Sequence, residues 1–542
     1  MEPLYLKSSV AAEPLFNEWY AWALLIYPPT AALITKNLHL RVLDSYRQFP
    51  DMHAEAARSQ ALLGGMFVDA EVAPRKAREL FEHTVSELAG LVDLAAAIGA
   101  LNELLQKNAV GFSLEELYSR IPAPLSGYVE LVYDLDNRPS VRFLERLFYK
   151  GAHYHEGRQS LLLCERNEDT RPFFLSTPRF EQAGDVRVAR PFACKALDQL
   201  FDSRRRPLSR ARVTMLAEEL RIAAAQFEQF GSLFDTTPPA ALRPHERHET
   251  GGVRIRYFGH ATLLIESGYT TLLTDPLISY GSQPAAVRER FSFADLPERI
   301  DYVAITHAHQ DHVVLETLLQ IRARTDRVLV PKNVSGCLQD PALKGILQMS
   351  GFPHVTELAE LDELAVPGGR IVGIPFLGEH GDLNIGSKIA YFIEFDGIRI
   401  LCLADANNLQ PAIYEHIKSH VGAVDAMFIG MECVGAPLSW LYGPLLTKPI
   451  SYKMDRSRRL NASNCDRALE LVRIFEPRAV FVYAMALEPW LRHISSVVYT
   501  PDAAPLLESE RLVQTCRQMG LTAARLQGMQ EILITATDVE LR

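Results

Sequence analysis

Apolar runs of strand length follow one another through the second half of the chain. The run at 302–305 is followed by seven polar or small residues and then by a helical pattern at 313–321. The other runs that predict strands are 253–266 (two strands around a Gly-containing turn), 271–276, 370–375, 388–395, 398–405 and 478–483. We therefore expect this half to be rich in β-structure.

The first 235 residues mix two periodicities. Apolar side chains at helical spacing predict helices at 31–46, 73–108 and 213–230. Strands are predicted at 127–135, 141–148 and 160–164, the first two joined by a turn at 136–139. These patterns predict an α+β domain with a short antiparallel sheet.

One segment predicts a domain boundary. Residues 235–244 are rich in proline, and 245–252 are polar, as is typical of a connection between domains. We expect an N-terminal domain at 1–235, a linker at 236–252 and a second domain at 253–542.

The polar segment after the strand at 302–305 carries the strongest chemical signal. It reads Thr-His-Ala-His-Gln-Asp-His, so His307, His309, Asp311 and His312 fall within six residues. Alternation along a loop turns His307 and His309 the same way, and Asp311 and His312 can reach a second ion beside the first. Imidazole and carboxylate suit first-row divalent metals. The alternative is a His-rich surface loop, but the position between strand and helix favours a dinuclear metal site.

Composition narrows the class of protein without defining it. A net charge of −10 and a pI of about 5.9 give no support to nucleic-acid binding. Seven cysteines are scattered singly, which favours reduced thiols and a cytoplasmic location. No secretory signal and no apolar run of transmembrane length are found, so we expect no membrane partner.

The motif and its flanking strands resemble the metallo-β-lactamase superfamily. The resemblance covers about residue 252 to the C-terminus and implies an αββα fold for the second domain. It implies that Asp275, at the end of the third strand, belongs to the family pattern, and that Asp405 bridges two metals.

The chain departs from the hydrolases of that superfamily at two positions. In the loop 376–382, Glu379 competes with His380 for the place of a third histidine ligand, and we favour Glu379. Met485 stands where a further histidine is usual, and its thioether is a poor ligand for a hard or borderline ion. The remaining ligand set is rich in oxygen, which suits iron or manganese better than a pair of zinc ions.

With these departures, the chain is similar to the diiron aminoacyl β-hydroxylases of nonribosomal peptide synthesis, the family of the chloramphenicol-pathway β-hydroxylase. The resemblance implies two non-haem iron ions, oxo- or hydroxo-bridged, that use O2 and external electrons. The implied ligands are His307, His309 and Glu379 on one iron, Asp311 and His312 on the other, and Asp405 between them. Glu379 and Asp405 are the expected catalytic carboxylates, and His260, His380, Asp275 and Met485 are expected around the ligands.

The implied activity is β-hydroxylation of an amino acid held as a thioester on a carrier domain. Aryl-alanine and aliphatic residues such as leucine both fit. The implied partners are that carrier domain, an electron donor and a second copy of the chain. A basic insertion that contains Lys448, Lys453, Arg456, Arg458 and Arg459 is either a solvated loop or a carrier-docking surface. The alternatives are a dizinc hydrolase of an ester, lactone or phosphodiester, and a metal-free assembly partner.

Overall fold

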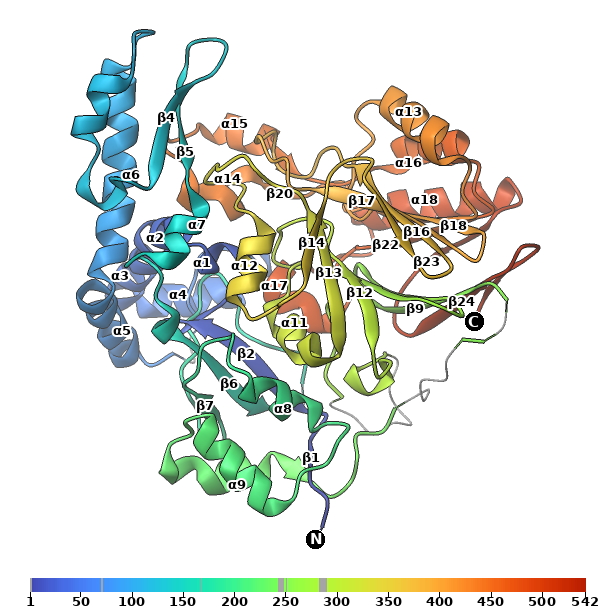
Figure 1. The fold of residues 1–542 in the computed structure, drawn as a ribbon, viewed down its shortest axis with the longest axis horizontal. Coiled ribbons are helices and arrows are strands. Elements are labelled where there is room, and N and C mark those ends of the chain that lie inside the picture. The colour runs from blue at the N-terminus through green and yellow to red at the C-terminus, as the bar shows by residue number, and fades with distance from the viewer. Residues whose placement is uncertain (1, 70–71, 167, 242–247, 250, 282–289) are drawn as a thin grey trace.

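The computed structural model describes residues 2–69, 72–166, 168–241, 248–249, 251–281 and 290–542. In the second half of the chain, two β-sheets pack face to face and helices cover their outer faces (Figure 1). The expected α+β region followed by an αββα domain is confirmed.

The sheets have eight and seven strands. The first runs β14 (Val355–Leu358), β13 (Thr325–Pro331), β12 (Ile300–Ala304), β11 (Thr271–Thr274), β10 (Thr262–Glu266), β9 (Val253–Gly259), β24 (Gln530–Ile534) and β25 (Val539–Leu541). The second runs β15 (Glu363–Val366), β16 (Gly369–Pro375), β17 (Ile389–Phe395), β18 (Ile398–Cys402), β19 (Ala426–Gly430), β22 (Ala479–Tyr483) and β23 (Thr522–Arg525).

Alternation along the strands divides their side chains between two apolar layers. In β10, Leu263 and Ile265 belong to the core between the sheets, whereas Leu264 belongs to the core outside the first sheet. All three are fully buried. Strands that are covered on both faces read as continuous apolar runs, which is why strands such as β10, β17 and β22 could be predicted from the pattern.

Three helices cover the outer face of the second sheet, namely α13 (Pro411–Val421), α16 (Cys465–Phe475) and α18 (Ala504–Gln518). In α16 the buried residues recur every three or four positions, which gives one apolar face. The helix begins after Asn464, whose side chain accepts a hydrogen bond from the backbone N–H of Arg467.

The N-terminal half packs against the outer face of the first sheet. Its sheet has the order β3 (Trp19–Tyr20), β2 (Val10–Phe16), β6 (Gln159–Glu165) and β7 (Val186–Val188), and β2 packs on α11 (Leu315–Ile321). Val10 and Leu161 share one apolar core with Leu273 and Val303 of the first sheet. The two halves therefore stabilise one another.

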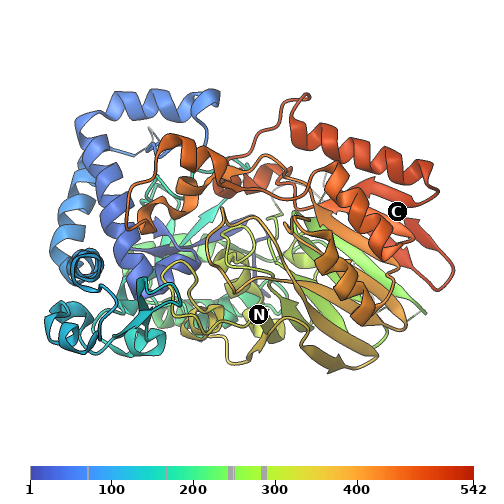
Figure 2. The same cartoon turned by 90° about the horizontal axis from the view of Figure 1, so that it is seen from above.

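Helices cover the remaining faces of the N-terminal half. They are α1 (Ala23–Ile26), α2 (Pro28–Ile34), α3 (Leu40–Gln48), α4 (Pro50–Arg58), α5 (Pro74–Glu87), α6 (Ala89–Asn108), α7 (Glu145–Lys150), α8 (Ala196–Asp202), α9 (Arg210–Glu219) and α10 (Phe227–Ser232). Figure 2 shows the first of these helices (blue) and the C-terminal helices (red) at opposite ends of the molecule.

Several predicted elements of the N-terminal half were wrong in their bounds. The helix expected at 73–108 is interrupted at Leu88, that at 213–230 is two helices, and that at 31–46 contains the π-helical segment Thr35–His39. The strand expected at 141–148 is β5 (Pro139–Phe143) followed by α7, because Leu144, Leu147 and Phe148 have helical rather than alternating spacing. β5 pairs with β4 (Val129–Tyr133) in a separate hairpin.

The longest helix requires one correction. By length and composition alone, α6 could cross a membrane, with a mean hydropathy of 1.2 over its most apolar window. Its buried residues, among them Leu94, Ile98 and Leu101, pack in the core with α2 and α5. α6 therefore packs as a core helix.

The expected linker at 236–252 falls partly outside the described residues, which omit 242–247 and 250. His248, within it, is buried, and its Nε2 lies 3.2 Å from the carbonyl of Gly252. The boundaries at 235 and 253 remain predictions.

A buried ion cluster joins the two halves. Glu13 on β2 accepts hydrogen bonds from Arg171 (3.1 Å) and Arg179 (2.8 Å). Arg171 also donates to Glu316 of α11 at 2.9 Å, and the hydroxyl of Tyr280 donates to the same carboxylate. Since α11 directly follows the metal-binding motif, this cluster holds the motif against the N-terminal sheet.

Candidate metal centre

The predicted metal motif lies in the loop between β12 and α11, at the carboxyl end of β12 in the first sheet. The loop after β16 brings Glu379 from the second sheet to the same place, and the turn after β18 brings Asp405. The backbone N–H of Ile389 in β17 donates to the carbonyl of Thr306 at 2.9 Å. Both sheets thus fix the position of the motif.

Asp275, at the end of β11, fixes the orientation of the motif through hydrogen bonds to its carboxylate. Its carboxylate accepts hydrogen bonds from the backbone N–H of Thr306 (2.8 Å) and from the Thr306 hydroxyl (2.7 Å). His312 Nδ1 lies 2.9 Å from the same carboxylate, and His307 Nδ1 lies 2.9 Å from the Thr306 hydroxyl. A carboxylate behind a histidine fixes its tautomer and leaves Nε2 free for a metal.

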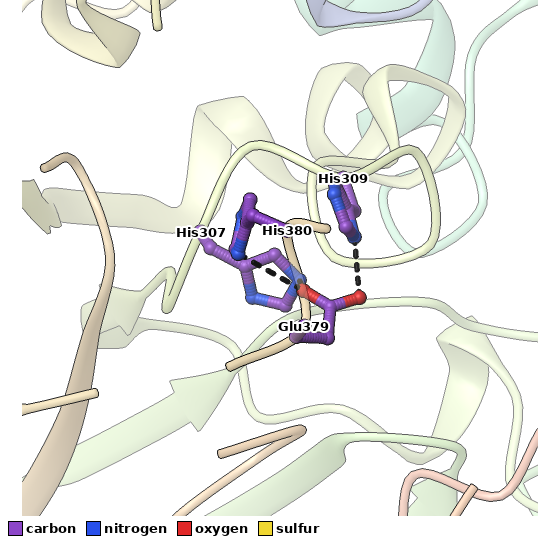
Figure 3. Close-up of side chains that lie close together, drawn as sticks. All are labelled: His307, His309, Glu379 and His380. Atoms are coloured by element: carbon purple, nitrogen blue, oxygen red, sulfur yellow. Dashed lines mark ion pairs between the residues drawn. The ribbon is translucent and has the colours of Figure 1, made fainter. Parts of the chain in front are cut away.

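The first group of candidate ligands surrounds Glu379 (Figure 3). One carboxylate oxygen, Oε1, lies 2.6 Å from His309 Nδ1, and the other, Oε2, lies 3.1 Å from His307 Nε2. These three side chains have the chemistry and spacing of one metal site.

His380 lies in the same group, with its Nδ1 3.5 Å from Glu379 Oε2. The carbonyl of Gly378 lies 3.2 Å from that nitrogen and can only accept a hydrogen bond, so Nδ1 carries a proton. This proton leaves Nε2 as the ring nitrogen of His380 that can face a metal. Glu379 contacts both His309 and His307 through its two oxygens, which favours Glu379 as their shared partner.

The second group surrounds His312. Its Nε2 lies 2.7 Å from Asp405 Oδ2 and 4.0 Å from Asp311 Oδ1. Asp405 Oδ2 also lies 4.0 Å from His307 Nε2 of the first group. Asp405 is therefore within reach of both groups, as a bridging carboxylate must be.

His260, in the turn between β9 and β10, also lies in the second group. The backbone N–H of Ala486 donates to its Nδ1 at 3.3 Å, so a neutral ring carries its proton on Nε2. That nitrogen lies 3.4 Å from Asp311 Oδ2. His260 therefore lies beside Asp311 with its Nε2 directed at the second group.

The electrostatics of the site fit a pair of divalent cations. Burial, together with the neighbouring rings, lowers the pKa of His307 well below its usual value, so this ring is neutral. Burial opposes a proton on His312, but Asp275 and Asp405 outweigh it and raise its pKa. A metal replaces such a proton. Among the described residues, the buried atoms Nε2 of His260, Nε2 of His307, Nε2 of His312 and Oε2 of Glu379 have no hydrogen-bond partner, as expected of atoms that face a metal centre.

One contact of the centre comes from a residue that the sequence did not single out. The hydroxyl of Tyr442, in α14 (Leu438–Tyr442), lies 2.9 Å from Nε2 of His309, on the side of the ring opposite Glu379. The segment between β19 and α16, which contains α14, thus closes over the metal-binding residues. No sequence spacing links Tyr442 to the motif, because the contact depends on the path of the insertion.

Met485 lies apart from both groups of candidate ligands. Its side chain is buried in the core outside the second sheet. The adjacent backbone nevertheless contributes, because the N–H groups of Ala484 and Ala486 donate to the carbonyl and the ring of His260.

Left-handed backbone is concentrated around the centre. The φ angles are 49° at His260, 32° at Asp275, 66° at Glu379 and 46° at Ala404. Non-glycine residues rarely adopt such angles, which cost about 1–3 kcal/mol each and recur at functional sites. The fold therefore tolerates strain to direct these side chains into the centre.

Comparisons with known proteins agree with this geometry. Residues 5–238 match the diiron non-haem β-hydroxylase N-terminal domain, and 254–432 match the β-lactamase superfamily domain. A hydroxylase of Streptomyces venezuelae, 4-amino-L-phenylalanyl-[CmlP-peptidyl-carrier-protein] 3-hydroxylase, is 38% identical over 523 residues, which are 96% of this chain and 98% of the relative.

Solved structures extend the likeness to three dimensions. The crystal structure of CmlA, a diiron β-hydroxylase from Streptomyces venezuelae, matches with a TM-score of 0.92 at 37% identity, and covers 98% of this chain and 100% of that one. A UPF0173 metal-dependent hydrolase of Flavobacterium johnsoniae is 36% identical over 152 residues, only 26% of this chain and 63% of the relative. The whole-length match decides between the two, and this chain belongs to the family of diiron non-haem β-hydroxylases.

Proposed function

We propose that this protein hydroxylates the β-carbon of an amino acid carried as a thioester on a peptidyl carrier domain. The observation that carries the proposal is the similarity, over nearly the full length of both chains, to a hydroxylase that acts on such a substrate. The site supports it because three carboxylates and five imidazoles converge there, and the three carboxylates with three of the imidazoles form a ligand set that suits iron.

We assign the ligands from the geometry of the two groups. His307, His309 and Glu379 would hold one iron, Asp311 and His312 the other, and Asp405 would bridge them. The paired ions supply the redox chemistry that activates O2. The protein's own residues orient the ligands: Asp275 and Thr306 hold His312 and His307, Tyr442 holds His309, and His260 holds Asp311.

A pocket of about 610 Å³, including the space at its mouth, opens onto the candidate ligands. Asp311, Glu379 and Asp405 lie along one side of it. Much of the rest is apolar and includes Trp440 and Leu441. Such a wall excludes water from the reacting carbon and fits an aromatic or aliphatic side chain.

A second pocket, of about 970 Å³, supports a tethered substrate. Ser495 and Val497 line the pocket at the metal centre, whereas Ser496 and Val498 line the second. One short segment therefore separates the two. We propose that the carrier arm approaches through the second pocket, which Arg492 also lines and where its guanidinium can meet a phosphate.

Exposed apolar side chains in the N-terminal half support a docking role for residues 1–235. Phe49, Met52, Leu62 and Leu63 are each at least 44% exposed. Leu62 and Leu63 line the second pocket, and the neighbouring Gly64 carbonyl accepts a hydrogen bond from Trp440 at 2.9 Å. We propose this surface for carrier docking, and the same half for contacts between two copies of the chain. The electron donor and the cytoplasmic location remain expectations.

Only some of the basic residues in the insertion are available to bind a carrier domain. Arg458 donates to the carbonyl of Gly381 at 2.7 Å, and Arg459 donates to that of Val434 at 2.9 Å, so both stabilise the insertion itself. Lys448, Lys453 and Arg456 are exposed. We propose that only these three are available to an acidic face of the carrier.

Metal content separates this proposal from the alternatives. Protein produced with ample iron is expected to hold about two iron ions per chain and to show a visible absorption band, as the oxygen-rich ligand set favours iron. Elemental analysis with absorption spectroscopy measures both. Two tightly held zinc ions, with ester hydrolysis that persists without O2, would instead support the hydrolase.

A further inference from the structure

The pocket at the metal centre contains one carboxylate that the ligand assignment does not use. Glu432 lies two residues after β19, the strand that pairs in parallel with β18, and β18 leads to Asp405. The end of β19 lies directly against that ligand, since a Cβ at Gly430 would lie 2.7 Å from Asp405 Oδ1. Neighbouring parallel strands thus deliver both carboxylates to one edge of the sheet.

Glu432 is fixed in place by a hydrogen bond rather than by a salt bridge. The backbone N–H of Gly435 donates to its Oε2. Among the described residues it forms no ion pair, because Arg459 directs its guanidinium to the carbonyls of Val434 and Gly435 instead. No lysine or arginine is among the described residues that line the pocket.

A carboxylate that lines a largely apolar pocket without a lysine or arginine among the lining residues favours a cationic ligand. A cation bound beside this carboxylate would form a charge-assisted hydrogen bond with it. Since Asp311, Glu379 and Asp405 are the proposed metal ligands, Glu432 is the acidic residue of the pocket lining that remains for the substrate.

We propose that Glu432 binds the α-ammonium group of the aminoacyl thioester. An aminoacyl thioester has no free carboxylate, so its ammonium is the one full charge that this part of every such substrate shares. The ammonium stands on the carbon next to the β-carbon. Holding it at Glu432, beside Asp405, directs the β-carbon towards the metal centre, while the side chain packs on the apolar wall. This inference rests on the proposed function and makes Glu432 a positioning and specificity residue.

The test varies the amine and the carboxylate independently. Four carrier-bound probes are compared, namely L-phenylalanyl, 4-amino-L-phenylalanyl, 3-phenylpropanoyl and 3-(4-aminophenyl)propanoyl thioesters. The enzymes are wild type, Glu432→Gln, Glu432→Asp and Glu510→Gln, the last changing an exposed glutamate on α18. Measurements are kcat/KM for hydroxylation, carrier binding by calorimetry, and iron content.

Loss of a hydrogen bond to a charged group corresponds to roughly 10- to 100-fold. Glu432→Gln is expected to lower kcat/KM and affinity by that factor for the two probes with an α-amine and to leave the two without it within about 3-fold. Glu432→Asp should restore part of the preference, and Glu510→Gln should match wild type. Iron content should not change.

Two outcomes would overturn the inference. An equal loss on probes with and without the α-amine would show a merely structural role, and a loss that follows the ring amine would place Glu432 against the side chain. If wild type binds the carriers but hydroxylates none, the proposed function fails, and the affinities still decide the role of Glu432. Should Glu432→Gln not fold, Glu432→Asp decides by the same comparison.

Discussion

Glu379→Ala is expected to empty or weaken one of the two metal positions and to abolish most hydroxylation. Glu379 lies 2.6 Å from His309 and 3.1 Å from His307, so its loss removes a ligand and leaves both rings without their acidic partner. The loss of activity should exceed the roughly 10- to 100-fold typical of an outer contact. Iron analysis of the purified variant and single-turnover hydroxylation measure the two effects.

His380→Ala provides the matched control for that variant. His380 is the adjacent residue, is also buried, and has the same candidate ligands nearby, but Glu379 is the residue whose two oxygens contact both His307 and His309. We expect this variant to keep about two iron ions and to lose activity only within the range of an outer contact. A normal iron content in Glu379→Ala with an empty position in His380→Ala would reverse the assignment.

Glu13→Gln is expected to destabilise the protein by about 3–5 kcal/mol, the usual effect of removing one partner from a buried ion pair. Glu13 is fully buried and accepts hydrogen bonds from Arg171 and Arg179, so the variant leaves those guanidinium groups with less negative charge. The apparent melting temperature, measured at constant scan rate, reports the loss. Glu165→Gln is the control, because Glu165 is exposed and its pair with Lys7 is worth at most about 1 kcal/mol.

The effect of Glu13 should also depend on pH. Burial raises its pKa, but Arg179, Arg171 and Arg166 outweigh burial and lower the pKa from 4.5 to about 2. A carboxyl whose pKa is depressed in the folded state stabilises the protein above its unfolded value, and that contribution is lost as the pH falls through the folded value. The gap in stability between wild type and Glu13→Gln should therefore narrow between pH 4.5 and about 2. A gap that stays constant would contradict this role.

Sequence patterns predicted the strands on either side of the motif, but missed β13, β14, β15, β19, β23, β24 and β25. Many of the predicted strands are buried on both faces. Such strands read as unbroken apolar runs, and polar residues at their ends mark the edge of the sheet where ligands gather. The motif 306–312 could be interpreted in this way because its residues are adjacent in the chain. Asp275, Glu379 and Asp405 come from other strands, and only the resemblance to a family connected them to the motif.

The features that could not be predicted from the sequence depend on tertiary contacts. Tyr442 and Glu432 belong to the insertion and the turn after β19, and nothing in their local sequence shows that they approach the metal centre. In the N-terminal half, β2 was missed because it contains Glu13 and Pro14, a buried charge and a proline that are unusual in strands. The buried charge of Glu13 is stabilised by Arg166, Arg171 and Arg179, which are far from it in the sequence.

A comparison of free and carrier-bound amino acid as substrates tests the central claim most directly. Iron-loaded protein, a chemical reductant and O2 are incubated with free amino acid, or with the same amino acid on a phosphopantetheinylated carrier domain, and the products are identified by mass spectrometry. We expect the β-hydroxylated product only from the carrier-bound form and only with O2, because the thioester removes the carboxylate charge and the carrier adds binding energy remote from the reacting carbon. Efficient hydroxylation of the free amino acid would contradict the role of the carrier, and hydrolysis without O2 would contradict the oxygenase itself.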